Sequence, residues 1–182
     1  GYSEEWQVEA ARRGLPNFKS TPKALDTLNS AKNVELFESL KVLDRTELEA
    51  RQTILFEDYV KRLCVEVKVL IQMCQQSIVP VVVQYVREVR EVVEVGKGKG
   101  SEKLLKGLVK ELEKMLEGVE ELKARLHEVH GKATVKESAH YCEDQLIPLM
   151  EKTRAAADEL EQMLPAEKWP LPTYHMMLFH QD

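Results

Sequence analysis

The amino-acid sequence predicts an all-helical protein, built around an antiparallel bundle of three long helices. Glycine and proline, which interrupt regular structure, number only 8 and 7 among 182 residues. Apolar residues also recur at steps of three and four along three long stretches. Such a period, with short turns between the stretches, is typical of helices that pack antiparallel around a shared core. Short helices are expected before the bundle, and an extended apolar tail after it.

Residues 1–45 are expected to form short helices that would link the bundle to a preceding catalytic domain. Ser3 can cap the first of them, and Gly14 follows its last turn. Pro22 marks a second start, because proline is favoured in the first turn of a helix. A third short helix is expected over 33–40.

Residues 46–164 are expected to hold the three long helices. A capping box at Thr46 and Glu49 begins the first of them, and no glycine interrupts it before Gly96. Pro80 should kink this helix, because proline removes a backbone donor and clashes with the preceding turn.

The second long helix follows the glycine-rich turn over 96–100, with Ser101 as its expected cap, and runs for roughly 28 residues to Gly131. The third begins at a capping box formed by Thr134 and Glu137 and stops at Pro165. Counting 1.5 Å per residue from these turns places Pro80 and Pro148, the prolines of the first and third helices, within about 3 Å of each other in height.

Residues 165–182 differ from the bundle, since they contain prolines near their start and are strongly apolar. A segment of this composition is expected to dock rather than stay in solvent. Whether it docks on another chain or closes the core of its own domain stays open. Six aromatic and aliphatic residues form the candidate interface: Trp169, Leu171, Tyr174, Met177, Leu178 and Phe179.

No catalytic, cofactor-binding or metal-binding set of residues is predicted. The loop 96–101 precedes a helix and could hold a phosphate, but its spacing is not that of a P-loop, so a solvated turn is favoured. His127 and His130 are three residues apart on one helix, and His140 could approach them across the turn. A zinc-protease motif needs histidines four positions apart, one more than here, so histidines at a helix end are the favoured interpretation over a metal site.

Composition narrows the class of protein further. A net charge of −5 without a long basic block argues against nucleic-acid binding, and no apolar run approaches the ~20 residues that span a membrane. Cys64, Cys74 and Cys142 fall within helical patterns and are expected to be reduced core thiols. The first residues lack a signal peptide and an initiator Met, as expected of a trimmed chain. The predicted location is therefore intracellular, in the cytoplasm or the interior of an organelle.

Both ends of the sequence resemble type III glutamine synthetases. The start, Gly1 to Trp6 with 13–17 and 21–25, resembles the segment that follows their catalytic domain. The end, 169–174 with 177–179, resembles their extreme C-terminus, although His175 and Met176 depart from the pattern. The resemblance is weakest over 86–132. Between the ends, the matching positions are Arg51, Tyr59, Glu66, Pro80 and Pro148.

The resemblance implies that this chain is the C-terminal part of a large ligase that joins ammonia to glutamate. Such an enzyme uses ATP and divalent metals, held by carboxylates of a sheet-rich catalytic domain, and assembles from hexameric rings. None of those motifs has a counterpart in this sequence, so no cofactor is expected in this chain. The implied partners are the remainder of the parent subunit and its neighbours in a homo-oligomer. The alternative is an independent helical module for protein interactions.

Overall fold

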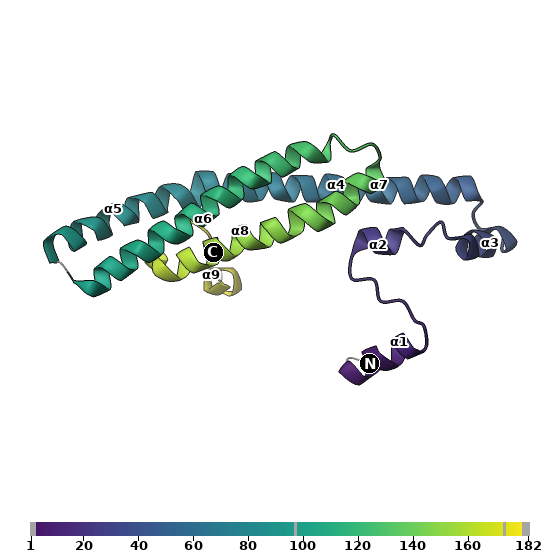
Figure 1. Ribbon diagram of the computed structural model, residues 1–182, viewed down its shortest axis with the longest axis horizontal. Helices are drawn as coiled ribbons and strands as arrows, with labels where there is room; N and C mark the ends of the chain where they lie inside the picture. The colour runs from purple at the N-terminus through teal and green to yellow at the C-terminus, as the bar shows by residue number, and fades with distance from the viewer. Residues whose placement is uncertain (1–2, 97, 173, 180–182) are drawn as a thin grey trace. The chain divides into compact units, whose positions relative to one another are not determined.

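The computed structural model describes residues 3–96, 98–172 and 174–179 as helices joined by turns (Figure 1). These residues contain no strand, which confirms the predicted all-helical class. Backbone packing divides the chain into two compact units. The first comprises Gly1–Lys61 and Ala133–Glu143, and the second comprises Arg62–Lys132 and Asp144–Asp182. The predicted division into 1–45, 46–164 and 165–182 follows local sequence character, whereas these units follow packing.

The first unit contains the short helices, and their local signals explain where they begin and end. The Ser3 hydroxyl accepts a hydrogen bond from the Trp6 amide at 3.4 Å, as predicted for a cap. Gly14 has φ 72°, a left-handed conformation that glycine adopts without strain, and it closes the first helix. The short helices are α1 (Glu4–Arg12), α2 (Thr21–Leu25), α3 (Ala31–Ser39) and α7 (Val135–Tyr141).

Helix α4 (Arg45–Gln72) is capped two residues earlier than the sequence indicates. Asp44 accepts a hydrogen bond from the Glu47 amide at 2.8 Å, and the Glu47 carboxylate accepts one from the Asp44 amide at 2.9 Å. The capping box predicted at Thr46 and Glu49 is therefore wrong. Two possible capping boxes, Asp44 with Glu47 and Thr46 with Glu49, overlap in this stretch. The Asp44 carboxylate prevails because it accepts a charge-assisted hydrogen bond, which is stronger than one to a threonine hydroxyl.

A helix without a break runs from α4 through Met73–Ile78 into α5 (Val79–Gly96). Met73–Ile78 is a π-helical segment, and a second one, Cys142–Leu146, leads into α8 (Ile147–Met163). Each π-helical segment ends two residues before a proline. The wider π turn moves the carbonyl that would clash with the proline ring. The kink that the sequence predicts at Pro80 thus corresponds to a local widening of the helix.

The two prolines do not lie at the same height. Ile147 and Arg154 line one groove together with Leu63 and Leu70 of α4, so Pro148 lies alongside that part of α4. At 1.5 Å per residue, Pro80 is on the order of 20 Å further along. Part of the error lies in α6 (Lys99–Val129), which spans 31 residues and begins after Gly98 rather than at Ser101. The rest arises because counting residues cannot supply the offset between packed helices.

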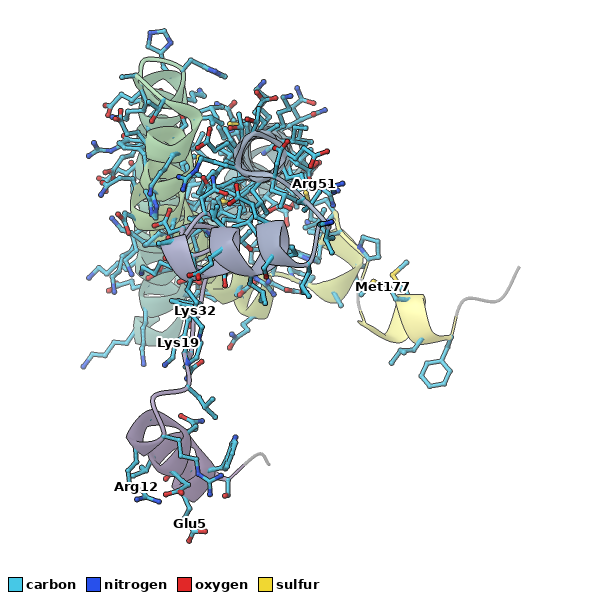
Figure 2. All side chains as sticks on the ribbon, turned by 90° about the vertical axis from the view of Figure 1, so that its right-hand side faces the viewer. Glu5, Arg12, Lys19, Lys32, Arg51 and Met177 are labelled. Atoms are coloured by element: carbon cyan, nitrogen blue, oxygen red, sulfur yellow. The ribbon has the colours of Figure 1, made fainter. Side chains whose placement is uncertain are left out.

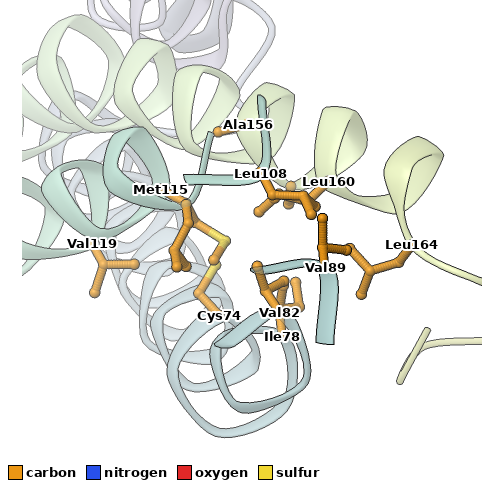
Figure 3. Packing of buried hydrophobic residues seen from close by; sticks show 12 residues of the cluster. Cys74, Ile78, Val82, Val89, Leu108, Met115, Val119, Ala156, Leu160 and Leu164 are labelled. Atoms are coloured by element: carbon orange, nitrogen blue, oxygen red, sulfur yellow. The ribbon is translucent and has the colours of Figure 1, made fainter. Parts of the chain in front are cut away.

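The second unit is organised around α6, which packs against both α5 and α8 (Figure 1). Its core takes residues from the first long helix, from α6 and from α8. Figure 3 shows Cys74 and Met115 facing each other in this core and Leu108 beside Leu160, and these side chains are 0 % exposed. The three cysteines are buried and unbridged, in agreement with the prediction. Burial raises the pKa of the Cys74 thiol to about 11, so the thiol stays protonated at neutral pH.

Helices α6 and α8 approach closely at Gly118. A Cβ atom at this position would lie 2.4 Å from the Thr153 hydroxyl oxygen. Thr153 is fully buried, and its hydroxyl donates to the Leu149 carbonyl at 2.8 Å. The polar group in this core therefore has its hydrogen bond, and the missing side chain of Gly118 makes the room for it.

The helix Arg45–Gly96 includes an 18-residue window with a mean hydropathy of 1.4, which by length and composition alone could cross a membrane. Only 17 % of this window is buried. The helix nevertheless supplies Cys74, Ile78 and Val82 to the core of the second unit. The sequence analysis predicts that no segment spans a membrane, and this stays a prediction.

Candidate functional site

The root of the C-terminal tail is fixed to α5. A short 3₁₀ helix, Ala166–Lys168, follows α8. The Lys168 ammonium forms an ion pair with Glu88 and lies 5.7 Å from the centroid of the Tyr85 ring. Because Glu88 and Tyr85 are both on α5, the chain is anchored by charge and by a cation–π contact where it leaves the bundle.

Trp169 and Leu171 continue this anchoring with apolar contacts. Both side chains are half-buried and pack against the core of the second unit. They also help to form a groove of about 330 Å³, with the Arg154–Asp158 ion pair at its edge. The apolar side chains lining this groove come from Leu70, Met73, Cys74, Ile78, Ala157, Trp169, Leu171, Pro172 and Met177.

The tip of the tail is exposed. It forms the short helix α9 (Tyr174–Leu178), and Met177 is visible on it in Figure 2. Met177, Leu178 and Phe179 are 58 %, 73 % and 65 % exposed, respectively. The side chain of Tyr174, a predicted interface residue, lies outside the described residues. The six predicted residues therefore include two that pack within their own unit and three at an exposed tip, and their role as an interface stays a prediction.

A second polar arrangement lies in the first unit, where α2 packs against α7. Asp26, which directly follows α2, pairs with Lys136 at 2.9 Å and with His140 Nε2 at 3.0 Å. Glu143 pairs with Lys23 at 2.9 Å, and one of its oxygens lies 3.7 Å from His140 Nδ1. We call these five residues the polar clamp. It joins side chains more than one hundred positions apart, and no local motif in the sequence points to it.

The charges of the polar clamp are set by competing effects. Burial raises the pKa of Asp26, but the neighbouring Lys136 and His140 outweigh it, so the pKa lies below its usual value. Burial likewise raises the pKa of Glu143, while Ser20, Lys23 and His140 lower it to a net value below the ordinary one. Both carboxylates are therefore charged at neutral pH.

We expect the polar clamp to stabilise the first unit at neutral pH and to weaken in acid. A carboxylate with a depressed pKa contributes stability above its unfolded-state pKa, and this contribution is lost as the pH falls through the folded-state value. Asp26→Asn should lower stability at pH 7 by about 1 kcal/mol and flatten its decline below about pH 4. Urea unfolding across pH 3–7 measures this, with Glu57→Gln, in an exposed i,i+4 pair with Lys61, as the control. Equal pH profiles for both variants would contradict it.

The other predicted polar features show no binding geometry. The described residues contain no group of three His, Cys, Asp or Glu side chains that could hold a metal ion. His140, which the sequence offers as a third nitrogen, is instead engaged with Asp26. In the loop 96–101, the Ser101 hydroxyl donates to the Gly98 carbonyl at 2.8 Å, while Lys97 lies outside the described residues.

Comparisons with known proteins agree with the sequence resemblance. The chain is 30% identical over 98% of its length to the type-3 glutamine synthetase of Dictyostelium discoideum. It is 31% identical over 98% of its length to the glutamine synthetase of Bacteroides fragilis (strain YCH46). The chain spans 26% of the length of each of these relatives. The family described as the glutamine synthetase C-terminal domain matches residues 1–97. The resemblance to the C-terminal helical region of type III glutamine synthetases is thereby confirmed, and the chain belongs to the glutamine synthetase C-terminal domain family.

Proposed function

We propose that this chain is the structural and assembly region of a type III-like glutamine synthetase, an ATP-dependent glutamate–ammonia ligase. The observation that carries the proposal is a family match to a C-terminal domain, in a chain about a quarter as long as its relatives. Its partners are the remainder of the parent subunit and neighbouring subunits of a homo-oligomer. ATP and divalent metal would be bound by the catalytic part of that enzyme, inside the cell.

Exposed apolar side chains in the first unit support an assembly role. Leu40, Val42 and Ile54 are each at least 60 % exposed. Ile54 also lines an open groove of about 280 Å³ together with Leu28, Phe37, Leu43, Leu48, Arg51 and Leu55. Apolar patches of this kind mark surfaces that another part of a protein covers.

The alternative is an independent helical interaction module that shares this fold. The mass of the native gene product in its source cell separates the two. A product several times larger than 20.9 kDa supports the synthetase fragment, whereas a product near that mass supports the module.

The isolated chain should not make glutamine. Activating the glutamate carboxylate requires bound ATP, metal ions and a pocket that excludes water, and we assign no residue of this chain to these tasks. Phosphate and glutamine release from ATP, glutamate, ammonia and magnesium measures this directly. Turnover that persists at constant specific activity through purification would refute the assembly proposal.

Shortening the tail at two positions should separate its root from its tip. Ending the chain after Pro165 removes Trp169 and Leu171 from the core, so we expect the melting temperature to fall by roughly 3–8 °C. Ending it after Pro172 keeps both anchors and removes the exposed residues Met177 to Phe179. Removing only the residues after Pro172 should leave the melting temperature unchanged and reduce self-association in sedimentation experiments. If neither truncation changes association, the tip is not an interface.

A further inference from the structure

The N-terminal helix α1 is a well-formed local structure. Beyond its Ser3 cap, its end is a Schellman motif, in which the Leu15 amide donates to the Ala10 carbonyl at 2.9 Å and the Gly14 amide donates to the Ala11 carbonyl at 3.0 Å. This motif folds Leu15 back over the last turn of the helix. We call residues 4–17 the N-terminal hook.

One face of the hook is apolar and uncovered. Trp6, Ala10 and Leu15 line an open depression of about 370 Å³, together with Pro16. Trp6 is 40 % exposed and Leu15 is 49 % exposed. No residue of α1 is buried by the described part of the chain. Burying the apolar surface that Trp6 and Leu15 still expose would be favourable, by roughly 25 cal/mol per Å².

One flank of the hook, about 60–120° around the helix from Trp6, already has its polar partners. Glu9 accepts hydrogen bonds from the Arg12 guanidinium at 2.7 and 2.8 Å and from Arg13 at 2.7 Å. Arg13 also lies 5.8 Å from the centroid of the Trp6 ring, so it borders the apolar face. Glu5 and Arg12, labelled in Figure 2, are exposed side chains of this flank. The charged side chains therefore border the Trp6 face on one side, and their charges are paired with one another.

A helix of this length needs packing to persist. The nine residues of α1 fall below the ~12–15 residues at which an isolated helix becomes even marginally stable in water. In proteins, most helical stability comes from burying an apolar face. The caps and the ion pairs define the ends of α1, but within the described residues nothing buries its Trp6 face.

We propose that the N-terminal hook docks, through Trp6 and Leu15, on the portion of the same polypeptide that precedes Gly1. This inference rests on the proposed function. The relatives are about four times as long as this chain, and the matched family is a C-terminal domain, so most of such a polypeptide lies before the hook. Two parts of one polypeptide joined by a short tether have an effective concentration near the millimolar range, so a small apolar contact suffices.

Hydrogen exchange measured by mass spectrometry tests this proposal in the full-length polypeptide and in the isolated chain. We expect the amides of α1 to exchange about tenfold more slowly in the full-length polypeptide, which corresponds to ~1.4 kcal/mol of protection. Trp6→Ser in the full-length polypeptide should abolish this protection. Val8→Ser is the matched control, because Val8 is 72 % exposed and lies about 200° around the helix from Trp6. Peptides from α8 report whether each variant remains folded.

Three outcomes would overturn the proposal. Fast exchange of α1 in the full-length polypeptide would show that the hook is not docked there. Slow exchange in the isolated chain at micromolar concentration would show that it folds back on its own domain, and slowing only at high concentration would identify a second copy as the partner. The mass of the native product tests the proposed function separately. A large product whose α1 amides exchange fast would contradict the docking of the hook and leave the proposed function standing.

Discussion

Phe56→Ala is expected to destabilise the first unit by about 3–5 kcal/mol, the largest effect of any single truncation in that unit. Phe56 lies on α4 and is 2 % exposed. Its ring centroid is 6.4 Å from that of His140, which belongs to the polar clamp on α7. Removing the ring leaves a cavity where α4 and α7 meet, and the neighbouring clamp cannot collapse into it without separating its ion pairs.

Urea unfolding followed by circular dichroism measures this loss, and hydrogen exchange in α7 locates it. Phe18→Ala is the matched control, because Phe18 is 47 % exposed and its truncation should change stability by no more than ~0.5 kcal/mol. Equal effects of the two substitutions would show that Phe56 does not hold α4 and α7 together.

Gly118→Val is expected to destabilise the second unit by about 3 kcal/mol, and so to lower its melting temperature by roughly 6–12 °C. The new Cβ would stand 2.4 Å from the Thr153 hydroxyl oxygen and 3.3 Å from the Thr153 Cβ. Thr153 cannot turn away cheaply, because its hydroxyl donates to the Leu149 carbonyl and its side chain is fully buried. Helices α6 and α8 must therefore move apart.

Gly107→Ala provides the matched control on the same helix. Its new Cβ would meet only the flexible end of Met163, at 3.2 Å, and replacing glycine within a helix gains up to ~1 kcal/mol. We expect this variant to be neutral or more stable in thermal unfolding. Adding Thr153→Ala to Gly118→Val should recover part of the lost stability, because the two sites are in contact. Additive effects of the two substitutions would contradict a direct clash.

The two units differ in how they are held together. The second unit has a continuous apolar core that joins its three long helical segments. Among the described residues, the first unit buries fewer large side chains, chiefly Val34, Leu48 and Phe56, and adds the polar clamp. Its helix α1 contributes nothing to this interior. This difference supports the proposed role, in which the rest of a larger enzyme covers the exposed apolar surface of the first unit.

Local signals in the sequence determined the helical class and most helix ends. Ser3 and Gly14 delimit α1, and Thr134 caps α7 by accepting from the Glu137 amide at 3.1 Å. These predictions succeed because each depends on backbone groups within four or five residues, whose geometry the neighbouring side chains decide. The periodic apolar residues likewise identified the core, including Leu108 and Leu160, because only one face of each helix can be buried.

Tertiary structure alone decided the features that depend on two distant segments. The relative heights of Pro80 and Pro148 depend on how side chains interlock between helices, and a count of residues along each helix does not contain that offset. The fit of Gly118 against Thr153, the polar clamp and the separation of the tail into a packed root and an exposed tip arise in the same way. Each of these features depends on residues that interact only once the fold has brought them together, so no sequence pattern within either segment predicts it.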